Sequence, residues 1–341
     1  MPAPDDPAHP YADLTPDRVL DALASVGIRG DGSLQALGSY ENRVYLAGVE
    51  DATPVVAKFY RPQRWSDPAI GEEQAFVAEL AEREIPVVAP LVLGGCTLHA
   101  SGEFRFAVYP RCGGRAPELD RRETLEWMGR FLGRIHAVGA LKSFAHRPTL
   151  DRTTFGIEPR DWLLAHDFIP RDLREAWQAI ASQALDSIAR CYDRAGALSV
   201  LRLHGDCHAG NVLWIEHGAM DDPRRGPHFV DFDDARMGPA VQDLWMLLSG
   251  DRADMGRQLG FVLTGYDDFV DFDRRELHLV EALRTLRLLH YSAWLAQRWD
   301  DPAFPAAFPW FNTQRYWQDR ILELREQVAL MDEPALEPVS D

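Results

Sequence analysis

Hydrophobic and polar positions alternate along the first third of the chain in a pattern that predicts strands. Residues 38–49 and 53–62 are two such stretches, and a short polar turn separates them. Residues 70–83 instead carry apolar side chains at helical spacing, with glutamates around the rest of the helix. Short apolar stretches with glycine turns follow between residues 87 and 110. We therefore expect a β-rich segment with one main helix, preceded by a short helix that begins at Thr15-Pro16.

After residue 115 the spacing of apolar residues becomes mainly helical, and strand-like segments return only at 200–215 and 228–234. The pattern predicts helices over 119–139, 173–192, 239–250, 258–266 and 276–299. A Cys-Gly-Gly sequence at 112–114 is a natural flexible joint. We expect an α+β protein of two lobes with flexible tails: an N-lobe at 13–110, a hinge at 111–114, a mainly helical C-lobe at 115–330, and tails at 1–12 and 331–341.

Composition narrows the class of protein. Hydrophobic residues make up 46% of the chain, and no apolar run approaches the ~18 residues of a membrane helix. The N-terminus lacks the basic-then-apolar order of a signal peptide, and the four cysteines include no CxxC pair, which fits a reducing cytoplasm. The net charge of −17 disfavours binding to a phosphate backbone. We expect a cytoplasmic monomer that binds neither membranes nor nucleic acids.

The stretch LRLHGDCHAGNVLW (201–214) has apolar ends and a centre rich in side chains that bind protons or metals. Asp206 and Asn211 stand five residues apart in it. The stretch HFVDFDDA (228–235) is an apolar strand that ends in acids, with Asp231 first. Polar residues between the two stretches predict a hairpin turn. The hairpin would bring Asp206, Asn211 and Asp231 to one end.

Lys58 is the one charged residue in the apolar stretch VVAKFY (55–60). A buried ammonium group requires an anion, and the helix that follows offers Glu73 or Glu72. Phosphoryl transfer needs such an inventory: a lysine for nucleotide phosphates, an asparagine and an aspartate for Mg²⁺, and an aspartate that accepts the hydroxyl proton.

The motifs resemble those of the aminoglycoside phosphotransferase/choline kinase family, which has a protein-kinase-like fold. The resemblance runs from about residue 13 to residue 330 and is closer still to a bacterial member that is a cytoplasmic Ser/Thr protein kinase. It is carried by SYENRVY, VAKFYRP, HRP at 146–148, LRLHGDCHAGN, DDARMGPAVQDLWMLL and WDDPAFP at 299–305. The resemblance implies a kinase that uses ATP and Mg²⁺ to phosphorylate Ser/Thr hydroxyls of proteins in a stress response.

The same resemblance implies a role for each matching residue. Asp206 would be the catalytic base, and Asn211 and Asp231 the Mg²⁺ ligands, with Asp231 also counted as catalytic. Lys58 would bind the phosphates of ATP between the lobes. The remaining expected roles are Glu73 as the helix partner of Lys58, Ser39 in the loop that covers ATP, and Tyr109–Gly114 as the hinge that contacts adenine.

The chain departs from the kinase pattern in two places: no G-x-G-x-x-G precedes Lys58, and Phe-Asp rather than Phe-Gly follows Asp231. The role of Ser39 therefore depends on the resemblance alone. Roles outside the central set follow from local pattern. We expect His204 to bond backbone, Asp243 to bond the loop around Asp206, and His136 and Cys207 to be core. The roles of His208 and Asp233 stay open, and Asp234 is expected to be a turn acid.

Three other functions compete with a protein kinase. The first is a kinase of a small-molecule hydroxyl, such as an amino alcohol or an aminoglycoside-like acceptor, because the motifs do not determine the acceptor. The second is a metallohydrolase with His204, Asp206 and His208 as metal ligands. It leaves Lys58, Asn211 and Asp231 unexplained. The third is a pseudokinase, which is disfavoured because every catalytic position is filled. The physiological substrate and the stimulus cannot be read from the sequence.

Overall fold

The protein is described from a computed structural model, which defines residues 9–216 and 225–339. The chain forms two compact units. The first comprises Met1–Gly113 with Trp299–Ala307, and the second comprises Gly114–Arg298 with Phe308–Asp341. The sequence places residues 299–307 in the helical lobe, whereas this segment packs with the first unit.

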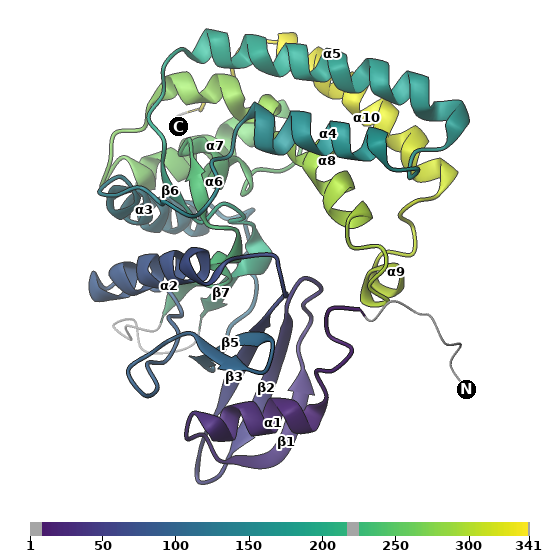
Figure 1. Ribbon diagram of the computed structural model, residues 1–341. Coiled ribbons are helices and arrows are strands. Elements are labelled where there is room, and N and C mark those ends of the chain that lie inside the picture. The colour runs from purple at the N-terminus through teal and green to yellow at the C-terminus, as the bar shows by residue number, and fades with distance from the viewer. Residues whose placement is uncertain (1–8, 217–224, 340–341) are drawn as a thin grey trace. The chain divides into compact units, whose positions relative to one another are not determined.

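The first unit is built on an antiparallel five-stranded sheet with the strand order β1-β2-β3-β5-β4 (Figure 1). β3 is the central strand, and its Lys58 pairs with Val44 of β2 and Ala107 of β5. The register therefore places Lys58 in the middle of the sheet. The strands are β1 (Gly30–Ala36), β2 (Arg43–Val49), β3 (Ala52–Tyr60), β4 (His99–Ser101) and β5 (Phe104–Pro110).

Two helices supply apolar side chains to this sheet. α1 (Pro16–Ser25) places Leu23 in a core with Phe59, while α2 (Asp67–Glu82) places Ile70 in a cluster with Tyr60. Successive strand residues point to opposite faces. Lys58 therefore lies on the same face as Tyr60, the face that α2 covers.

The helix starts follow from capping. The Thr15 hydroxyl accepts from the Arg18 N–H at 3.3 Å, which confirms the predicted start of α1. Ser66 caps α2 in the same way at Ala69, so this helix begins earlier than residue 70. The strand pattern was less informative. β1 was not predicted, because its glycine-containing sequence has mostly exposed side chains, and residues 87–95 form no strand.

The second unit is mainly helical. Its helices pack in pairs. α3 (Arg122–Gly139) packs against α7 (Arg252–Tyr266), and α4 (Glu158–Ala165) packs on α8 (Val280–Ala296). α5 (Arg171–Ala195) lies beside α10 (Gln314–Asp332), as Figure 1 shows. The sequence pattern missed α4 and α10, and α6 (Val241–Trp245) is shorter than the predicted 239–250. α9 (Ala303–Ala307) belongs to the first unit. None of the helices among residues 9–216 and 225–339 combines the length and the hydropathy that a membrane span requires.

Two short strand pairs lie among these helices and hold the central motifs. β7 (Val212–Ile215) pairs with β8 (Gly226–Phe229), which confirms the predicted hairpin, although its turn lies outside the described residues. β6 (Leu201–Leu203) pairs with β9 (Arg236–Gly238), a strand that the sequence pattern missed. Both pairs are antiparallel. Together they bring the segment between β6 and β7 next to the segment between β8 and β9.

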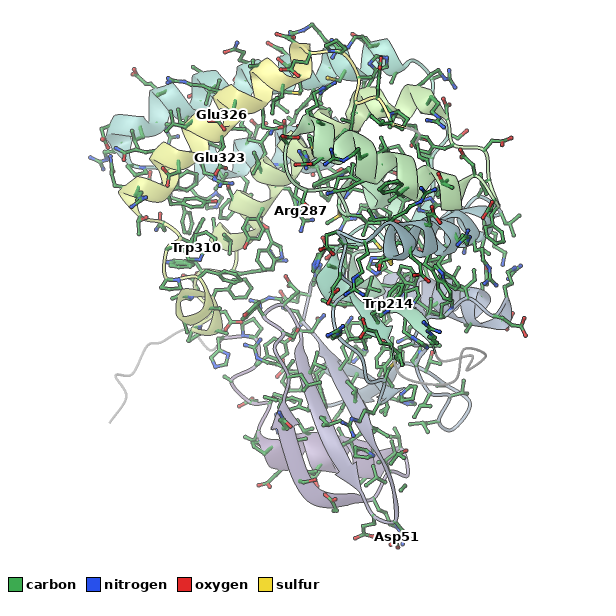
Figure 2. All side chains as sticks on the ribbon, turned by 180° about the vertical axis from the view of Figure 1, so that it is seen from behind. Asp51, Trp214, Arg287, Trp310, Glu323 and Glu326 are labelled. Carbon is green, nitrogen blue, oxygen red and sulfur yellow. The ribbon has the colours of Figure 1, made fainter. Side chains whose placement is uncertain are left out.

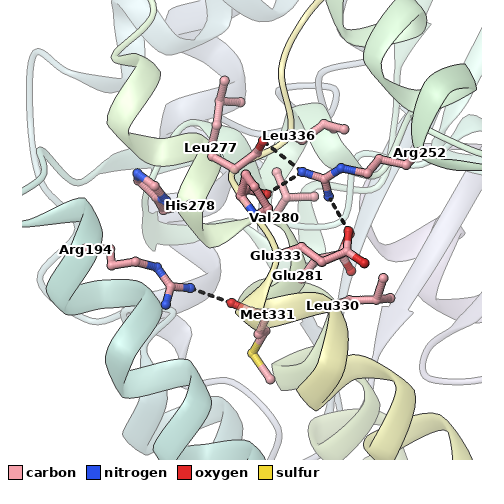
Figure 3. A pocket seen from close by; sticks show the side chains of 12 residues that line it. Arg194, Arg252, Leu277, His278, Val280, Glu281, Leu330, Met331, Glu333 and Leu336 are labelled. Atoms are coloured by element: carbon pink, nitrogen blue, oxygen red, sulfur yellow. Dashed lines mark hydrogen bonds and ion pairs between the residues drawn. The ribbon is translucent and has the colours of Figure 1, made fainter.

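Residues 331–339 are packed, in contrast to the flexible tail predicted for residues 331–341, of which the last two lie outside the described residues. Met331 and Leu336 are buried. Arg252 donates to the carbonyl oxygens of Pro334 and Ala335, the latter at 2.8 Å, and Arg194 donates to that of Met331 at 2.6 Å. Figure 3 shows these contacts around a small pocket whose lining includes none of the candidate site residues. At the other end of the chain, Tyr11 of the predicted 1–12 tail is buried too.

Candidate active site

The loop that carries Asp206 is held by the buried carboxylate of Asp243. Its two oxygens accept from the backbone N–H groups of His204 and Gly205, both at 2.9 Å. The His136 ring also lies 3.1 Å from it and is buried. This arrangement confirms that Asp243 bonds the loop backbone and that His136 belongs to the core. Charge-assisted bonds to backbone N–H groups are among the stronger hydrogen bonds in proteins, so the loop has a fixed conformation.

Asp243→Ala is expected to lower the free energy of unfolding by about 2–6 kcal/mol, because two buried N–H donors lose their acceptor and each such loss costs about 1–3 kcal/mol. Urea unfolding measures this difference. Asp193→Ala, at an exposed position of α5, is the matched control and should stay within about 0.5 kcal/mol of the unsubstituted protein. A loss for Asp243→Ala as small as that of the control would contradict the anchoring role.

Gly205 is required where the loop passes the segment that follows Asp231. Its φ of +86° lies in the left-handed region, and a Cβ there would stand 2.2 Å from the carbonyl oxygen of Asp234. The close approach ties the two segments together.

His204 is a structural residue, as predicted. Its Nδ1 accepts from the Asp206 N–H at 3.4 Å, and its Nε2 lies 2.9 Å from the carbonyl oxygen of Val230, to which it donates. Its ring also packs on Phe232, with 4.4 Å between ring centroids. Because both nitrogens are engaged, His204 is not available as a metal ligand. Within residues 9–216 and 225–339, no group of three His, Cys, Asp or Glu side chains is placed to hold a metal ion.

The Asp206 carboxylate is held at both oxygens. Oδ1 lies 2.5 Å from Nη1 of Arg287, and Oδ2 lies 3.5 Å from Nε2 of His208. Nδ1 of His208 accepts from the Gly210 N–H at 2.9 Å, so its Nε2–H faces Asp206. Burial by itself raises the pKa of Asp206, but the hydrogen bond from His208 and the charge of Arg287 outweigh burial and hold this pKa below its ordinary value. Asp206 is therefore an ionised carboxylate.

Arg287 was missed by the sequence analysis. It extends from α8, is labelled in Figure 2, and meets Asp206 across 81 residues of chain. Arg284 and Arg298 stand in or beside the same helix, so no sequence signal singles out Arg287. His208, whose role the sequence left open, contacts the same carboxylate.

Asn211 and Asp231 lie at the adjoining strand ends. The Asn211 side-chain Nδ2 donates to the carbonyl oxygen of Asp206 at 2.9 Å, and its Oδ1 is the acceptor atom of the same amide. The Val230 N–H donates to the Asn211 carbonyl at 3.0 Å, so the hairpin brings Asn211 next to the segment that begins with Asp231. Asp231 has φ 59° and ψ 60°, a left-handed conformation that Asp and Asn tolerate better than most residues. The exposed position and strained backbone are typical of a functional residue.

The segment after Asp231 is fixed by two arginines. Arg147 is buried, and its guanidinium donates to the carbonyl oxygens of Asp233 and Ala235. Arg236 pairs with Asp234 at 2.5 Å, so Asp234 is a turn acid, as predicted. Asp233 is buried, and its role stays open.

The remaining candidates gather in the first unit. Lys58 and Glu73 are both buried, whereas Glu72 is half-buried, which favours Glu73 as the partner; their pairing stays a prediction. Lys58 Nζ lies 5.2 Å from the centroid of the Tyr60 ring. The Tyr60 hydroxyl is 3.1 Å from the Tyr109 hydroxyl and accepts from Gln74 Nε2 at 3.1 Å. These bonds connect β3 to α2 and β5 around the lysine.

The family model described as the phosphotransferase enzyme family matches residues 33–280. The chain belongs to this family, and the prediction of a phosphotransferase is confirmed. The two-lobe α+β kinase-like fold is confirmed as well.

Relatives match the chain almost from end to end. It is 44% identical to stress response kinase A from Escherichia coli (strain K12) over 330 residues, and this alignment covers 97% of each chain. It is 43% identical over 332 residues to the serine/threonine protein kinase RdoA from Salmonella typhimurium, covering 97% of this chain and 98% of the relative. Among solved structures, amicoumacin kinase hAmiN in complex with AMP-PNP, Ca²⁺ and Ami has a TM-score of 0.71 at 18% identity and 95% coverage of each chain. A microcompartment-associated aminopropanol kinase has a TM-score of 0.67 at 17% identity, covering 92% of this chain and 96% of the other.

Proposed function

We propose that the protein is an ATP- and Mg²⁺-dependent kinase that transfers the γ-phosphate to Ser/Thr hydroxyls of proteins in a stress response. The observation that carries the proposal is the arrangement of Asp206 and Asn211. The Asn211 side-chain amide donates to the backbone carbonyl of Asp206, so it lies in the same loop as the Asp206 carboxylate, beside the strand end that leads to Asp231. The relatives named as stress response kinases and as a Ser/Thr protein kinase support the acceptor class.

The residues fit a magnesium ion by their chemistry. Asn211 Oδ1 and the Asp231 carboxylate are hard oxygen ligands, which Mg²⁺ prefers. His204 would not bind the ion, because both of its ring nitrogens bond to backbone groups. When bound, the ion neutralises charge on the phosphate oxygens. Asp231 and Asn211 would hold it, and Lys58 would bind the nucleotide phosphates.

Asp206 would act on the acceptor. Its carboxylate would accept the proton of the attacking hydroxyl as the new oxygen–phosphorus bond forms and the bond to ADP breaks. Arg287 and His208 orient this carboxylate from two sides. These two contacts fix the position of the carboxylate before the acceptor binds.

The test is transfer of labelled γ-phosphate from ATP, with Mg²⁺, to a generic basic protein and to a panel of small alcohols and amino alcohols. Label on protein Ser/Thr, absent with Asp206→Ala, is the expected result. Label on small alcohols alone would retain the phosphotransfer chemistry but replace the protein acceptor with a small molecule. Transfer that persists in Asp206→Ala would contradict the site.

A further inference from the structure

The loop expected to cover ATP is held by side-chain bonds instead of being glycine-rich. It lies between β1 and β2 and contains Ser39, and its later residues Glu41 and Asn42 are buried. The Tyr11 hydroxyl donates to the carbonyl of Glu41 at 3.1 Å. The Arg61 N–H donates to Oδ1 of Asn42 at 3.0 Å. Glu41 and Asn42, at the β2 end of the loop, are therefore bonded to the rest of the first unit.

Arg43 joins this loop to a distant segment. Its Nη1 donates to the carbonyl of Tyr40 at 3.0 Å, and its Nη2 lies 3.3 Å from both carboxylate oxygens of Asp301. The guanidinium also stands 4.3 Å from the centroid of the Tyr11 ring. One side chain thus binds the loop backbone and Asp301 at the same time.

Asp301 is a buried carboxylate with two arginine partners. Besides Arg43, the Arg61 guanidinium lies 2.9 Å from its Oδ2, and the carboxylate accepts from the Ala303 N–H at 3.1 Å. Burial raises the pKa of Asp301, but the bond from Ala303 and the arginine charges lower it below its ordinary value. Asp301 is therefore charged in the folded protein. Removing one partner of a buried pair of this kind leaves an uncompensated charge, which is destabilising.

The segment that supplies Asp301 enters from the other unit. The chain leaves the second unit after Arg298, contributes Trp299–Ala307 to the first unit, and returns at Phe308. It anchors itself there through Asp301 and through Phe304, which is buried beside Arg61.

We propose that Asp301 is a positioning residue for the nucleotide: through Arg43 and Arg61 it clasps the loop around Ser39 in the conformation that binds ATP. This chain has no glycine-rich loop before Lys58. In its place, the clasp fixes the loop backbone before the nucleotide binds. It rests on the proposed function in one respect, namely that this loop binds the nucleotide.

Asp301→Asn tests the clasp, with the exposed neighbour Asp300→Asn as the matched control. Asparagine keeps the shape and the bond from Ala303 but loses the charge that binds both arginines. We expect the KM for ATP to rise about tenfold with kcat within about twofold, because a displaced loop weakens nucleotide binding without altering Asp206. Asp300→Asn should match the unsubstituted enzyme. An unchanged KM in folded Asp301→Asn, or equal effects of both variants, would overturn the proposal.

Hydrogen exchange of the amides of residues 38–43, without nucleotide, gives a second readout. Exchange there should be faster in Asp301→Asn than in Asp300→Asn, while the amides of β5 stay protected. Arg43→Met, which leaves Arg61 on Asp301, gives the same comparison if Asp301→Asn does not fold. Faster exchange throughout the first unit would show that Asp301 has a purely structural role. Unchanged exchange of residues 38–43 would show that Asp301 does not hold the loop. If the unsubstituted protein transferred no phosphate from ATP, the proposed function would fail, while the exchange result would still decide on the clasp.

Discussion

Asp206→Asn is expected to lower kcat by ~10²–10⁴-fold and to leave the affinity for ATP nearly unchanged. The carboxylate is the group that would accept the hydroxyl proton, and an amide of the same shape cannot. Asparagine can keep its oxygen toward Arg287, and the backbone bonds of His204 and Gly205 to Asp243 do not involve the replaced side chain. The fold and the nucleotide site should therefore survive the substitution.

Single-turnover phosphate transfer and calorimetric binding of an ATP analogue measure the two expectations separately. Asp193→Asn, at an exposed position of the same unit, is the control for a general loss of charge. Turnover within about threefold of the unsubstituted enzyme would show that Asp206 is not the base. A parallel loss of turnover and nucleotide binding would instead assign it to the nucleotide site.

The parts of the fold that the sequence predicted correctly have strong local patterns. The apolar stretch of β3, the amphipathic α2 and the β7–β8 hairpin can each be predicted from one continuous stretch of sequence. β1 has polar residues and glycines because its side chains are mostly exposed, so neither alternation nor composition indicates a strand. Residues 87–95 are apolar without forming a strand, since Pro90 cannot donate to a ladder.

The site shows the same division between local and distant information. Asp206 and Asn211 stand at fixed spacing in one loop, so their proximity follows from the chain itself. Arg287 and Asp301 reach their partners from far along the sequence, and nothing in their neighbourhood marks them. Asp243 is an intermediate case: its distance from the loop is modest, and its position at the start of a helix suggested a bond to backbone, which the structure confirms.

Asp231→Asn is expected to abolish the dependence of ATP binding on Mg²⁺ and to lower kcat/KM by about 10²–10³-fold, because the site loses its charged oxygen ligand. Asparagine is the informative substitution here. The backbone at residue 231 is left-handed, with φ 59°, and asparagine adopts this conformation readily, whereas alanine would add strain that has nothing to do with the ion.

The effect differs from that of Asp206→Asn, and the difference separates the two roles. A lost base leaves ATP bound but unreactive, whereas a lost ion ligand weakens binding itself. Calorimetric titration of ATP with Mg²⁺ and with EDTA compares the two variants directly. Asp206→Asn should retain the difference between the two conditions, and Asp231→Asn should bind ATP as weakly with Mg²⁺ as the unsubstituted protein does in EDTA. If Asp231→Asn kept the full Mg²⁺ dependence, the ion would have to be held elsewhere, and Asp231 would lose its place in the site.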